Sequence, residues 1–216
     1  MIERITNSDR DKCYACYRPI SSCMCEHITP FTTNTKFIIL MHPKEFRKTK
    51  NGTGRFTYQS LENSELYVGD DFSQHKRVNE LITNKDNNCF VLYPSANSLN
   101  LNNDALPKEV MGENIIFIID STWPCSKKML RLSPNVDALP KVSFTHTKLS
   151  QFQFKTQPNI HCLSTMESTL TVLELLNQHG LETIQEQNLH NFLSPFLEMV
   201  KYQVKQIDER KEVRFK

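Results

Sequence analysis

Four cysteines near the N-terminus have the spacing of metal ligands. Cys13, Cys16, Cys23 and Cys25 follow the pattern C-x2-C-x6-C-x-C. Two tight turns can gather such thiolates around one ion, and in a reducing compartment the pattern favours a structural zinc site over two disulfides or free thiols. Four thiolates also suit an iron–sulfur cluster. We therefore predict a zinc-binding N-terminal segment over residues 1–32, and we call its residues 13–25 the cysteine knuckle.

A single acid at the end of an apolar run is the second candidate for chemistry. Residues 115–119 read IIFII, which is typical of a strand buried on both faces, and Pro124 suits the first turn of a following helix. The DSTW segment at 120–123 would then lie at the carboxyl end of a central strand, where open α/β sheets bind ligands. Asp120 is therefore a candidate reactive group. The competing interpretation is that Asp120 or Thr122 only caps the helix.

Alternating strand and helix patterns predict the frame that would position these residues. Apolar runs predict strands at residues 36–41, 89–94, 115–119 and 141–144. Helical patterns are found over residues 73–85, from a capping box at Ser164 to Gly180, and from Leu189 onward, with a kink or late start expected at Pro195. This alternation indicates an α/β fold with a mostly parallel sheet flanked by helices.

Polar residues follow several of these elements and are expected to converge. They lie at 42–43, 93–98 and 120–123, and at the helix start 163–167. Meeting at one edge of a sheet, they would form a ligand pocket. The chain has only five glycines and contains neither a GxGxxG segment nor a P-loop, which disfavours a Rossmann-type nucleotide site.

Composition and charge limit the classes of protein to which the chain can belong. It has 216 residues with a formal net charge of +2, and no apolar run approaches the ~20 residues of a membrane helix. The polar N-terminus lacks the apolar core of a secretory signal, so we expect a cytoplasmic protein. Nucleic-acid contacts would need local basic patches, whose alternative interpretation is a solvated surface. The candidate basic residues are Lys44, Arg47, Lys48, Lys50, Arg55, Lys127, Lys128 and Arg131.

The motifs together resemble those of one protein family. DSTW, taken with the cysteine knuckle, resembles the Asp-x-Thr-Trp signature of the DTW-domain family. HPKEFRK, VLYP and LSTMES resemble, in the family's own order, its His-Pro-x-Glu motif, its Tyr-Pro strand end and its Ser-Thr-x-Glu helix start. The resemblance covers the chain from Cys13 to about Leu176. It implies that residues 33–216 form a SPOUT-like catalytic domain, which is a knotted α/β fold.

Members of this family are similar to RNA-modifying enzymes that bind S-adenosylmethionine. The resemblance implies transfer of the 3-amino-3-carboxypropyl group from that cofactor to N3 of a uridine in tRNA, with release of methylthioadenosine. Asp120 would be the general base. The residues expected at the cofactor are Tyr93, Pro94, Ser95, Asp120, Ser121, Thr122, Trp123, Leu163, Ser164 and Thr165. Trp123 would either stack on a ring or pack beneath the pocket, and the usual burial of tryptophan favours packing.

The RNA would be held through its phosphates, and the resemblance leaves its recognition open. The expected contacts are Arg47, Lys48, Lys50, Arg55, Lys127, Lys128 and Arg131. The cysteine knuckle would either grip the tRNA or only brace the N-terminus.

Three positions depart from the family pattern. Ser121 stands where a glycine is usual, and Phe152 and Lys155 replace the tyrosine and arginine of a Ser-x-Tyr-x-x-Arg segment. The lost hydroxyl and the lost bidentate guanidinium leave the target nucleotide open. Two other functions therefore remain: a SPOUT-like S-adenosylmethionine-dependent RNA methyltransferase, and a zinc-containing RNA-binding protein without catalysis.

Overall fold

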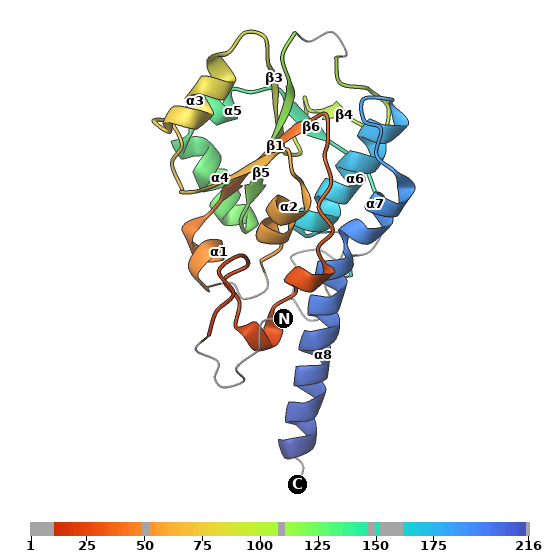
Figure 1. Cartoon of the computed structure of the whole chain (residues 1–216). Helices are drawn as coiled ribbons and strands as arrows, with labels where there is room; N and C mark the ends of the chain where they lie inside the picture. Colours follow the sequence, from red (N-terminus) through yellow and green to blue (C-terminus); the bar gives the residue numbers. More distant parts are fainter. Residues whose placement is uncertain (1–10, 49–51, 108–110, 147–149, 152–161, 215–216) are drawn as a thin grey trace.

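The computed structural model describes residues 11–48, 52–107, 111–146, 150–151 and 162–214, and it consists of a sheet with helices on both faces (Figure 1). The strands are β1 (Lys36–Met41), β2 (Ser64–Val68), β3 (Asn88–Leu92), β4 (Leu99–Asn100), β5 (Asn114–Asp120) and β6 (Lys141–Ser143). The helices are α1 (Pro43–Lys48), α2 (Gly54–Ser60), α3 (Lys76–Thr83), α4 (Trp123–Leu132), α5 (Pro134–Asp137), α6 (Thr165–Gln178), α7 (Glu186–Phe192) and α8 (Ser194–Arg214). Two 3-10 turns, η1 (Ile20–Ser22) and η2 (Cys25–His27), follow the first cysteines.

The described strands form one parallel sheet in the order β2-β1-β5-β3-β6-β4. In the register of β1 and β5, Met41 lies beside Asp120, so both strands end at the same level. Because parallel strands point the same way, the loops after β1, β3, β5 and β6 gather at one edge. The predicted α/β fold with a mostly parallel sheet flanked by helices is confirmed.

The central strands are buried on both faces. Phe37 and Ile39 of β1 join a hydrophobic cluster with residues of α2, α6, α7 and α8. Ile38 and Leu40, which point the other way, join a second cluster with residues of α3, α4 and α5. The same two groups of helices lie on opposite sides of the sheet in Figure 1. Burial on both faces explains why β1 and β5 are unbroken apolar runs in the sequence.

Four of the strands are those predicted from apolar runs, and two were not predicted. The runs at 36–41, 89–94, 115–119 and 141–144 correspond to β1, β3, β5 and β6, although β3 ends two residues and β6 one residue earlier than predicted. The additional strands β2 and β4 occupy the two edges of the sheet. Most of β2 is only partly buried and β4 has two residues, so neither carries the continuous apolar pattern of a central strand.

The predicted helices are present, and one of them is divided into two. Pro124 lies in the first turn of α4, and α6 begins with the predicted capping box. The final amphipathic segment is two helices, because α7 ends at Phe192 and α8 begins at Ser194, next to Pro195. Helix α2, which begins at Gly54 and contains the candidate basic residue Arg55, was not predicted.

The N-terminal segment shares a core with the rest of the chain. Cys16 and Met24 belong to the same hydrophobic cluster as Phe56 and Met199. The boundary predicted near residue 32 therefore separates two parts that pack together. The predicted knot depends on the path from β6 to α6, where residues 147–149 and 152–161 lie outside the described residues, as do the departures at Phe152 and Lys155. In the described part of the chain, every helix is too short or too polar to cross a bilayer.

Candidate active site and metal centre

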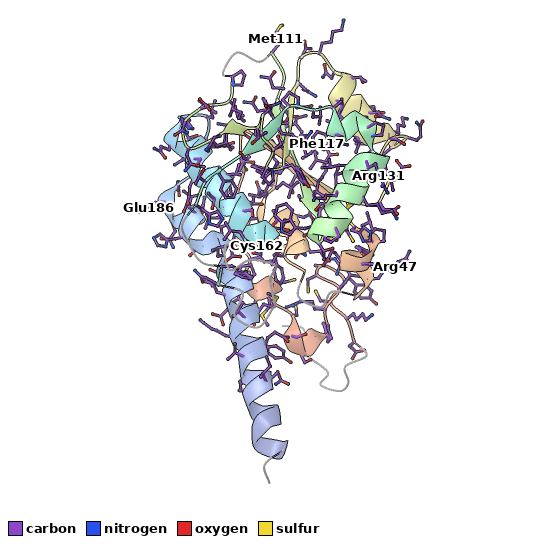
Figure 2. The ribbon with its side chains drawn as sticks, turned by 180° about the vertical axis from the view of Figure 1, so that it is seen from behind. Arg47, Met111, Phe117, Arg131, Cys162 and Glu186 are labelled. Carbon is purple, nitrogen blue, oxygen red and sulfur yellow. The ribbon has the colours of Figure 1, made fainter. Side chains whose placement is uncertain are left out.

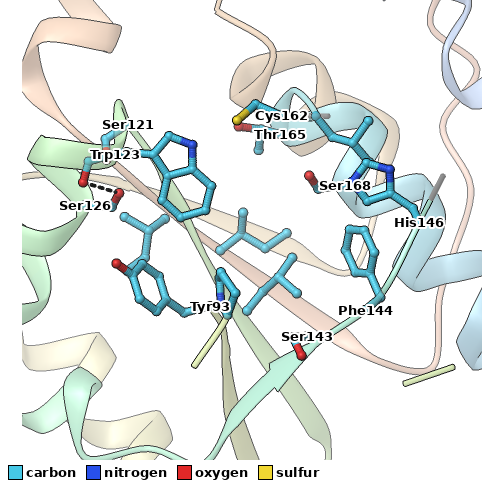
Figure 3. Close-up of a pocket in the computed structure, with 15 residues that line it drawn as sticks. Tyr93, Ser121, Trp123, Ser126, Ser143, Phe144, His146, Cys162, Thr165 and Ser168 are labelled. Atoms are coloured by element: carbon cyan, nitrogen blue, oxygen red, sulfur yellow. Dashed lines mark hydrogen bonds between the residues drawn. The ribbon is translucent and has the colours of Figure 1, made fainter. Parts of the chain in front are cut away.

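A cavity of about 320 Å³ opens at the carboxyl edge of the sheet, between the ends of β3, β5 and β6 and the beginnings of α4 and α6 (Figure 3). Its walls are mostly apolar, with several hydroxyl groups and one imidazole, which is the usual character of a small-molecule site. The lining residues are Leu92, Tyr93, Pro94, Ile118, Ile119, Ser121, Trp123, Ser126, Ser143, Phe144, His146, Cys162, Leu163, Thr165 and Ser168. We call this space the strand-end cavity.

Two aromatic rings stand on one side of the strand-end cavity. Tyr93 and Trp123 meet edge to face, with ring centroids 6.1 Å apart and an interplanar angle of 62°. Trp123 is 42% exposed, so the expectation that it packs beneath the pocket is wrong. Burial and the negative charge of Asp137 raise the pKa of Tyr93, which keeps its hydroxyl protonated. The open tryptophan ring can stack on a flat ligand.

Asp120 lies behind the wall of the strand-end cavity. Its side chain is 5% exposed, and its Oδ1 accepts a hydrogen bond from Thr165 Oγ1 at 2.6 Å. The other oxygen faces the beginning of α2, where a Cβ built on Gly54 would lie only 2.3 Å from Oδ2. Thr165 and both chain neighbours of Asp120, Ile119 and Ser121, line the cavity, whereas Asp120 is not among the lining residues. A ligand in the cavity would therefore contact the Thr165 hydroxyl, which in turn is hydrogen-bonded to this carboxylate.

The beginning of α6 is held by a closed hydrogen-bond network. Ser164 Oγ accepts from the Glu167 N–H at 3.3 Å, and the Glu167 carboxylate accepts from the Ser164 N–H at 2.8 Å. The same carboxylate accepts from Ser150 Oγ at 2.9 Å and from the Gln151 N–H at 2.7 Å. The Ser164 hydroxyl and Glu167 are thus engaged in capping. This network fixes the position of the adjacent Thr165.

The structure gathers only some of the residues expected at the cofactor. Tyr93, Pro94, Ser121, Trp123, Leu163 and Thr165 line the strand-end cavity. Ser95, Asp120, Thr122 and Ser164 do not, and the Thr122 carbonyl instead accepts from Ser126. After β1, His42 is not among the lining residues either, and its Nδ1 accepts from the Lys44 N–H at 3.1 Å.

Several lining residues were missed by sequence reasoning. Ser126 and Ser168 lie one helical turn after Thr122 and Thr165, so the 3.6-residue period could have found them. Phe144 and His146 follow the end of β6, a predicted strand whose end was not among the segments expected to converge. Cys162 also lines the cavity. It carried no signal beyond its proximity to the helix start.

The cysteine knuckle has the geometry of a four-thiolate metal centre. The sulfur atoms of Cys13, Cys16, Cys23 and Cys25 all lie within 4.8 Å of one another. The Cys13–Cys25 and Cys16–Cys23 sulfur separations are 3.7 and 3.8 Å. A tetrahedral site with Zn–S bonds of about 2.3 Å has edges of about 3.8 Å, whereas a disulfide needs about 2.05 Å. The predicted ligand set therefore fits zinc, and the separations exclude disulfides among these four.

A buried arginine balances the charge of the thiolates. Arg18 is 5% exposed, and its guanidinium carbon lies 5.2 Å from the centre of the Phe56 ring. Burial lowers the pKa of Arg18, and attraction to the sulfurs of Cys16, Cys23 and Cys25 opposes that change. Four thiolates around one zinc ion carry a net charge of about −2, so a cation beside them is favourable.

A second arginine connects the knuckle to the sheet domain. Arg55 donates from Nη1 to the Cys16 carbonyl at 3.2 Å and from Nη2 to the Phe46 carbonyl at 2.7 Å. Its guanidinium also lies 4.7 Å from the Tyr17 ring centre and 4.3 Å from that of Phe46. Arg55 was expected to contact RNA phosphates, but these donors are directed at the protein itself.

The other basic residues expected at RNA lie on α1 and α4. Arg47, Lys127, Lys128 and Arg131 are exposed, and Lys128 also forms an ion pair with Asp70 at 3.6 Å. Figure 2 shows Arg47 and Arg131 toward the same side of the molecule. Lys50 and the side chain of Lys48 lie outside the described residues.

Comparison with known proteins gives one family and no solved structure. The family model described as "DTW domain" matches residues 10–204. A Drosophila melanogaster protein named "tRNA-uridine aminocarboxypropyltransferase 2" is 30% identical over 176 residues, which cover 77% of this chain and 67% of that protein. A Mus musculus protein of the same name is 28% identical over 175 residues, covering 79% of this chain and 58% of that protein. No solved structure matches significantly.

Proposed function

Because the chain belongs to the DTW-domain family, we propose that it transfers the 3-amino-3-carboxypropyl group of S-adenosylmethionine to N3 of a uridine in tRNA. Methylthioadenosine is the second product. The observation that carries the proposal is the strand-end cavity at the DSTW segment, which has an exposed tryptophan in its wall and a buried acid behind it, hydrogen-bonded to the lining residue Thr165. The names of the fruit-fly and mouse relatives support the same reaction.

The strand-end cavity provides groups suited to an adenosine with a charged side chain. Trp123 and Tyr93 supply aromatic surface for the adenine ring. Hydroxyls of Ser121, Ser126 and Ser168 lie in the wall, and those of Ser121 and Ser126, which donate to backbone carbonyls, can accept from donors of the ligand. S-adenosylmethionine, when bound, supplies a carbon activated by the adjacent sulfonium. The apolar wall excludes water from that carbon and so limits its hydrolysis.

We assign the removal of the uridine N3 proton to Thr165 and Asp120. Thr165 Oγ1 lines the cavity and donates to Asp120 Oδ1 at 2.6 Å. In the proposed step, the uridine N3 proton passes to Thr165 Oγ1 while the Thr165 hydrogen passes to Asp120. The N3 electron pair forms the new N–C bond, and the electron pair of the broken C–S bond stays with sulfur. Asp120 remains the general base, but it acts through Thr165 instead of touching the uridine.

The products test the proposed reaction directly. Purified protein incubated with S-adenosylmethionine and an unmodified tRNA transcript is expected to release methylthioadenosine, with an aminocarboxypropyl uridine found by mass spectrometry of the nucleosides. Release of S-adenosylhomocysteine with a methylated nucleoside would instead establish the methyltransferase alternative. Absence of cofactor binding by calorimetry would favour a non-catalytic RNA-binding protein.

Replacement of Asp120 tests its role as the base. Asp120→Asn keeps the size of the side chain and can retain an acceptor for Thr165, but the amide cannot take up a proton. We expect turnover to fall by ~10²-fold or more while cofactor affinity stays close to that of the original protein. Single-turnover rates and calorimetry measure the two quantities. Unchanged turnover would show that Asp120 is structural.

A further inference from the structure

A second cavity, of about 610 Å³, lies between the cysteine knuckle, α1, α2 and α8. Its size falls within the range of ligand sites. In Figure 1 the knuckle and α8 lie side by side, and η2 contacts α8. We call this space the knuckle groove, and the residues that matter for its chemistry are Lys12, Tyr17, Arg18, Arg47, Arg55 and Gln203.

The lining of the knuckle groove is predominantly cationic. Its charged side chains are Lys12, Arg18, Arg47 and Arg55 against one acid, Glu45, and Arg18 offsets the thiolates of the metal centre, of which Cys16 also lines the groove. Arg18 and Arg55 are held by the knuckle, as described above, whereas Lys12 and Arg47 are exposed on different walls. With Arg18 offset by the thiolates, Lys12, Arg47 and Arg55 still outnumber Glu45, so positive charge is concentrated in this groove. Such a concentration in a concave surface attracts polyanions.

The same groove presents an aromatic platform. Tyr17 is 52% exposed, and its ring is supported by the Arg55 guanidinium at 4.7 Å and by Phe46, whose ring centre is 5.6 Å away. A ring held in this way loses little conformational freedom when a ligand stacks on it. Cations along a groove together with a stacking ring are the combination that binds single-stranded nucleic acid, since the cations meet phosphates and the ring meets a base.

The knuckle groove and the strand-end cavity approach Asp120 from two sides. Met41 pairs with Asp120 across β1 and β5 and lines the knuckle groove. Thr165, which is hydrogen-bonded to Asp120, lines the strand-end cavity. Arg55 of the groove is close enough to Asp120 for their charges to interact. A chain lying in the groove would therefore pass beside the wall that carries the reactive acid.

We propose that the knuckle groove binds single-stranded RNA, and that it holds the nucleotides adjoining the target uridine. This inference rests on the proposed function, which makes tRNA the substrate. Lys12 and Arg47 contact phosphates, Tyr17 stacks on a base, and α8 forms the opposite wall through Gln203. The cysteine knuckle is then part of the RNA site, which goes beyond bracing the N-terminus.

Neutralising the exposed groove cations is the first test. Lys12→Gln/Arg47→Gln removes two charges from the groove, and Lys76→Gln/Lys85→Gln removes two from exposed positions in and after α3. With a tRNA transcript, we expect the groove variant to bind roughly 10- to 100-fold more weakly at 0.1 M salt, with a salt-dependence slope smaller by about two. The control variant should bind as the original protein does. Equal affinities of the two variants would overturn the proposal.

A second pair of variants tests the α8 wall. Gln203→Glu places a negative charge in the groove, and Gln187→Glu places the same charge on an exposed position of α7. Only Gln203→Glu should weaken tRNA binding, by about tenfold at low salt and less at high salt. S-adenosylmethionine affinity, measured by calorimetry, should be unchanged in both. Identical tRNA affinities would remove α8 from the site.

These measurements separate failure of the groove from failure of the reaction. If the original protein makes the modified uridine while both groove variants bind tRNA like their controls, the groove proposal is wrong and the reaction stands. If the groove variants lose tRNA binding while no methylthioadenosine forms, the groove stands and the reaction is wrong. A single-stranded oligonucleotide should compete with tRNA for the groove, and an equally long duplex that competes better would contradict the single-stranded assignment.

Discussion

At the scale of single residues, the 2.6 Å contact between Thr165 and Asp120 determines how a proton can leave the strand-end cavity. A carboxylate that is 5% exposed cannot meet a nucleobase directly without movement of the groups in front of it. The Thr165 hydroxyl lies in the cavity wall and also donates a hydrogen bond to the acid. A hydroxyl that accepts one proton while it gives up another avoids a charged intermediate on threonine.

Substitutions of Thr165 distinguish this relay from direct contact. Thr165→Val keeps the shape but removes the hydroxyl, so turnover should fall by ~10²-fold, close to the loss in Asp120→Asn. Thr165→Ser retains the hydroxyl and should keep most of the activity. Because both positions act in one step, the double variant should lose little more than either single variant. If Thr165→Val keeps normal turnover in single-turnover assays, Asp120 contacts the uridine directly.

The motifs predict which residue types lie at the site, but they do not predict where the side chains point. The DSTW segment indicates that an acid and a tryptophan lie at a strand end, and both do. The local sequence does not reveal that Thr165, 45 positions away, covers the acid, nor that Trp123 is left open. Both facts depend on how α6 packs on the sheet. For the same reason, the burial statistics of tryptophan gave the wrong expectation for Trp123.

At the scale of elements, the contact between α2 and β5 positions the acid. A Cβ at Gly54 would lie 2.3 Å from Asp120 Oδ2, so Gly54→Ala forces α2 or the carboxylate to move. We expect this variant to unfold with a free energy lower by about 1–3 kcal/mol, and to lose activity. Removal of the carboxylate relieves the clash, so Gly54→Ala should cost much less stability in an Asp120→Ala background. Urea unfolding of the four proteins measures the coupling, and strict additivity would contradict the contact.

A carboxylate on the edge strand connects β2 to α3 and makes stability depend on pH. Glu65 accepts from Arg77 at 2.9 and 3.1 Å, and this pair lowers the pKa of Glu65 from 4.5 to about 2 against the opposing effect of burial. The unfolded chain takes up the proton first, so this stabilisation is complete above pH 4.5 and is lost as the pH falls toward 2. At pH 7, Glu65→Gln should lower the free energy of unfolding by about 1–2 kcal/mol. This value is smaller than the full pKa change implies, because solvent partly screens the pair.

Glu80→Gln is the matched control for Glu65, since Glu80 faces the same Arg77 at 3.7 Å from a more exposed position. Glu80→Gln should lower the free energy of unfolding by less than about 0.5 kcal/mol. Unfolding curves at pH 7 and pH 2.5 should show the Glu65→Gln difference shrinking in acid. A difference that is independent of pH would assign the effect to packing.

The central elements were predictable from the sequence because burial on two faces leaves a continuous signal. The run at 115–119 lies within β5 for this reason, and the capping box fixes the start of α6. The edge strand β2 was missed because its residues are partly exposed and its stability comes from pairing with β1 and from ion pairs such as Glu65–Arg77. Interactions between distant segments do not appear in a local pattern.

At the scale of the whole molecule, the cysteine knuckle completes the surface between α1 and α8. Cys16 and Met24 pack into the main hydrophobic cluster, and Arg55 holds the Cys16 carbonyl. The spacing of the cysteines predicted the ligand set, but not that its loop would be fastened to a helix of the sheet domain. Loss of the metal should therefore affect the knuckle groove before the strand-end cavity, which has no wall in the knuckle.

Replacement of one ligand tests this order of events. We expect the purified protein to contain about one zinc per chain, and Cys25→Ser to lose most of it, because the four sulfurs form one site. Cys125→Ser changes a cysteine outside both cavities and should keep the metal.

Cys25→Ser should melt at lower temperature and bind tRNA at least tenfold more weakly, since Tyr17 and Lys12 lose their support. Its S-adenosylmethionine affinity should change little, because the residues of the strand-end cavity are anchored by the sheet and by α6. Iron in place of zinc would reassign the centre, and a parallel loss of cofactor and tRNA binding would show that the knuckle stabilises the whole domain instead of shaping the groove.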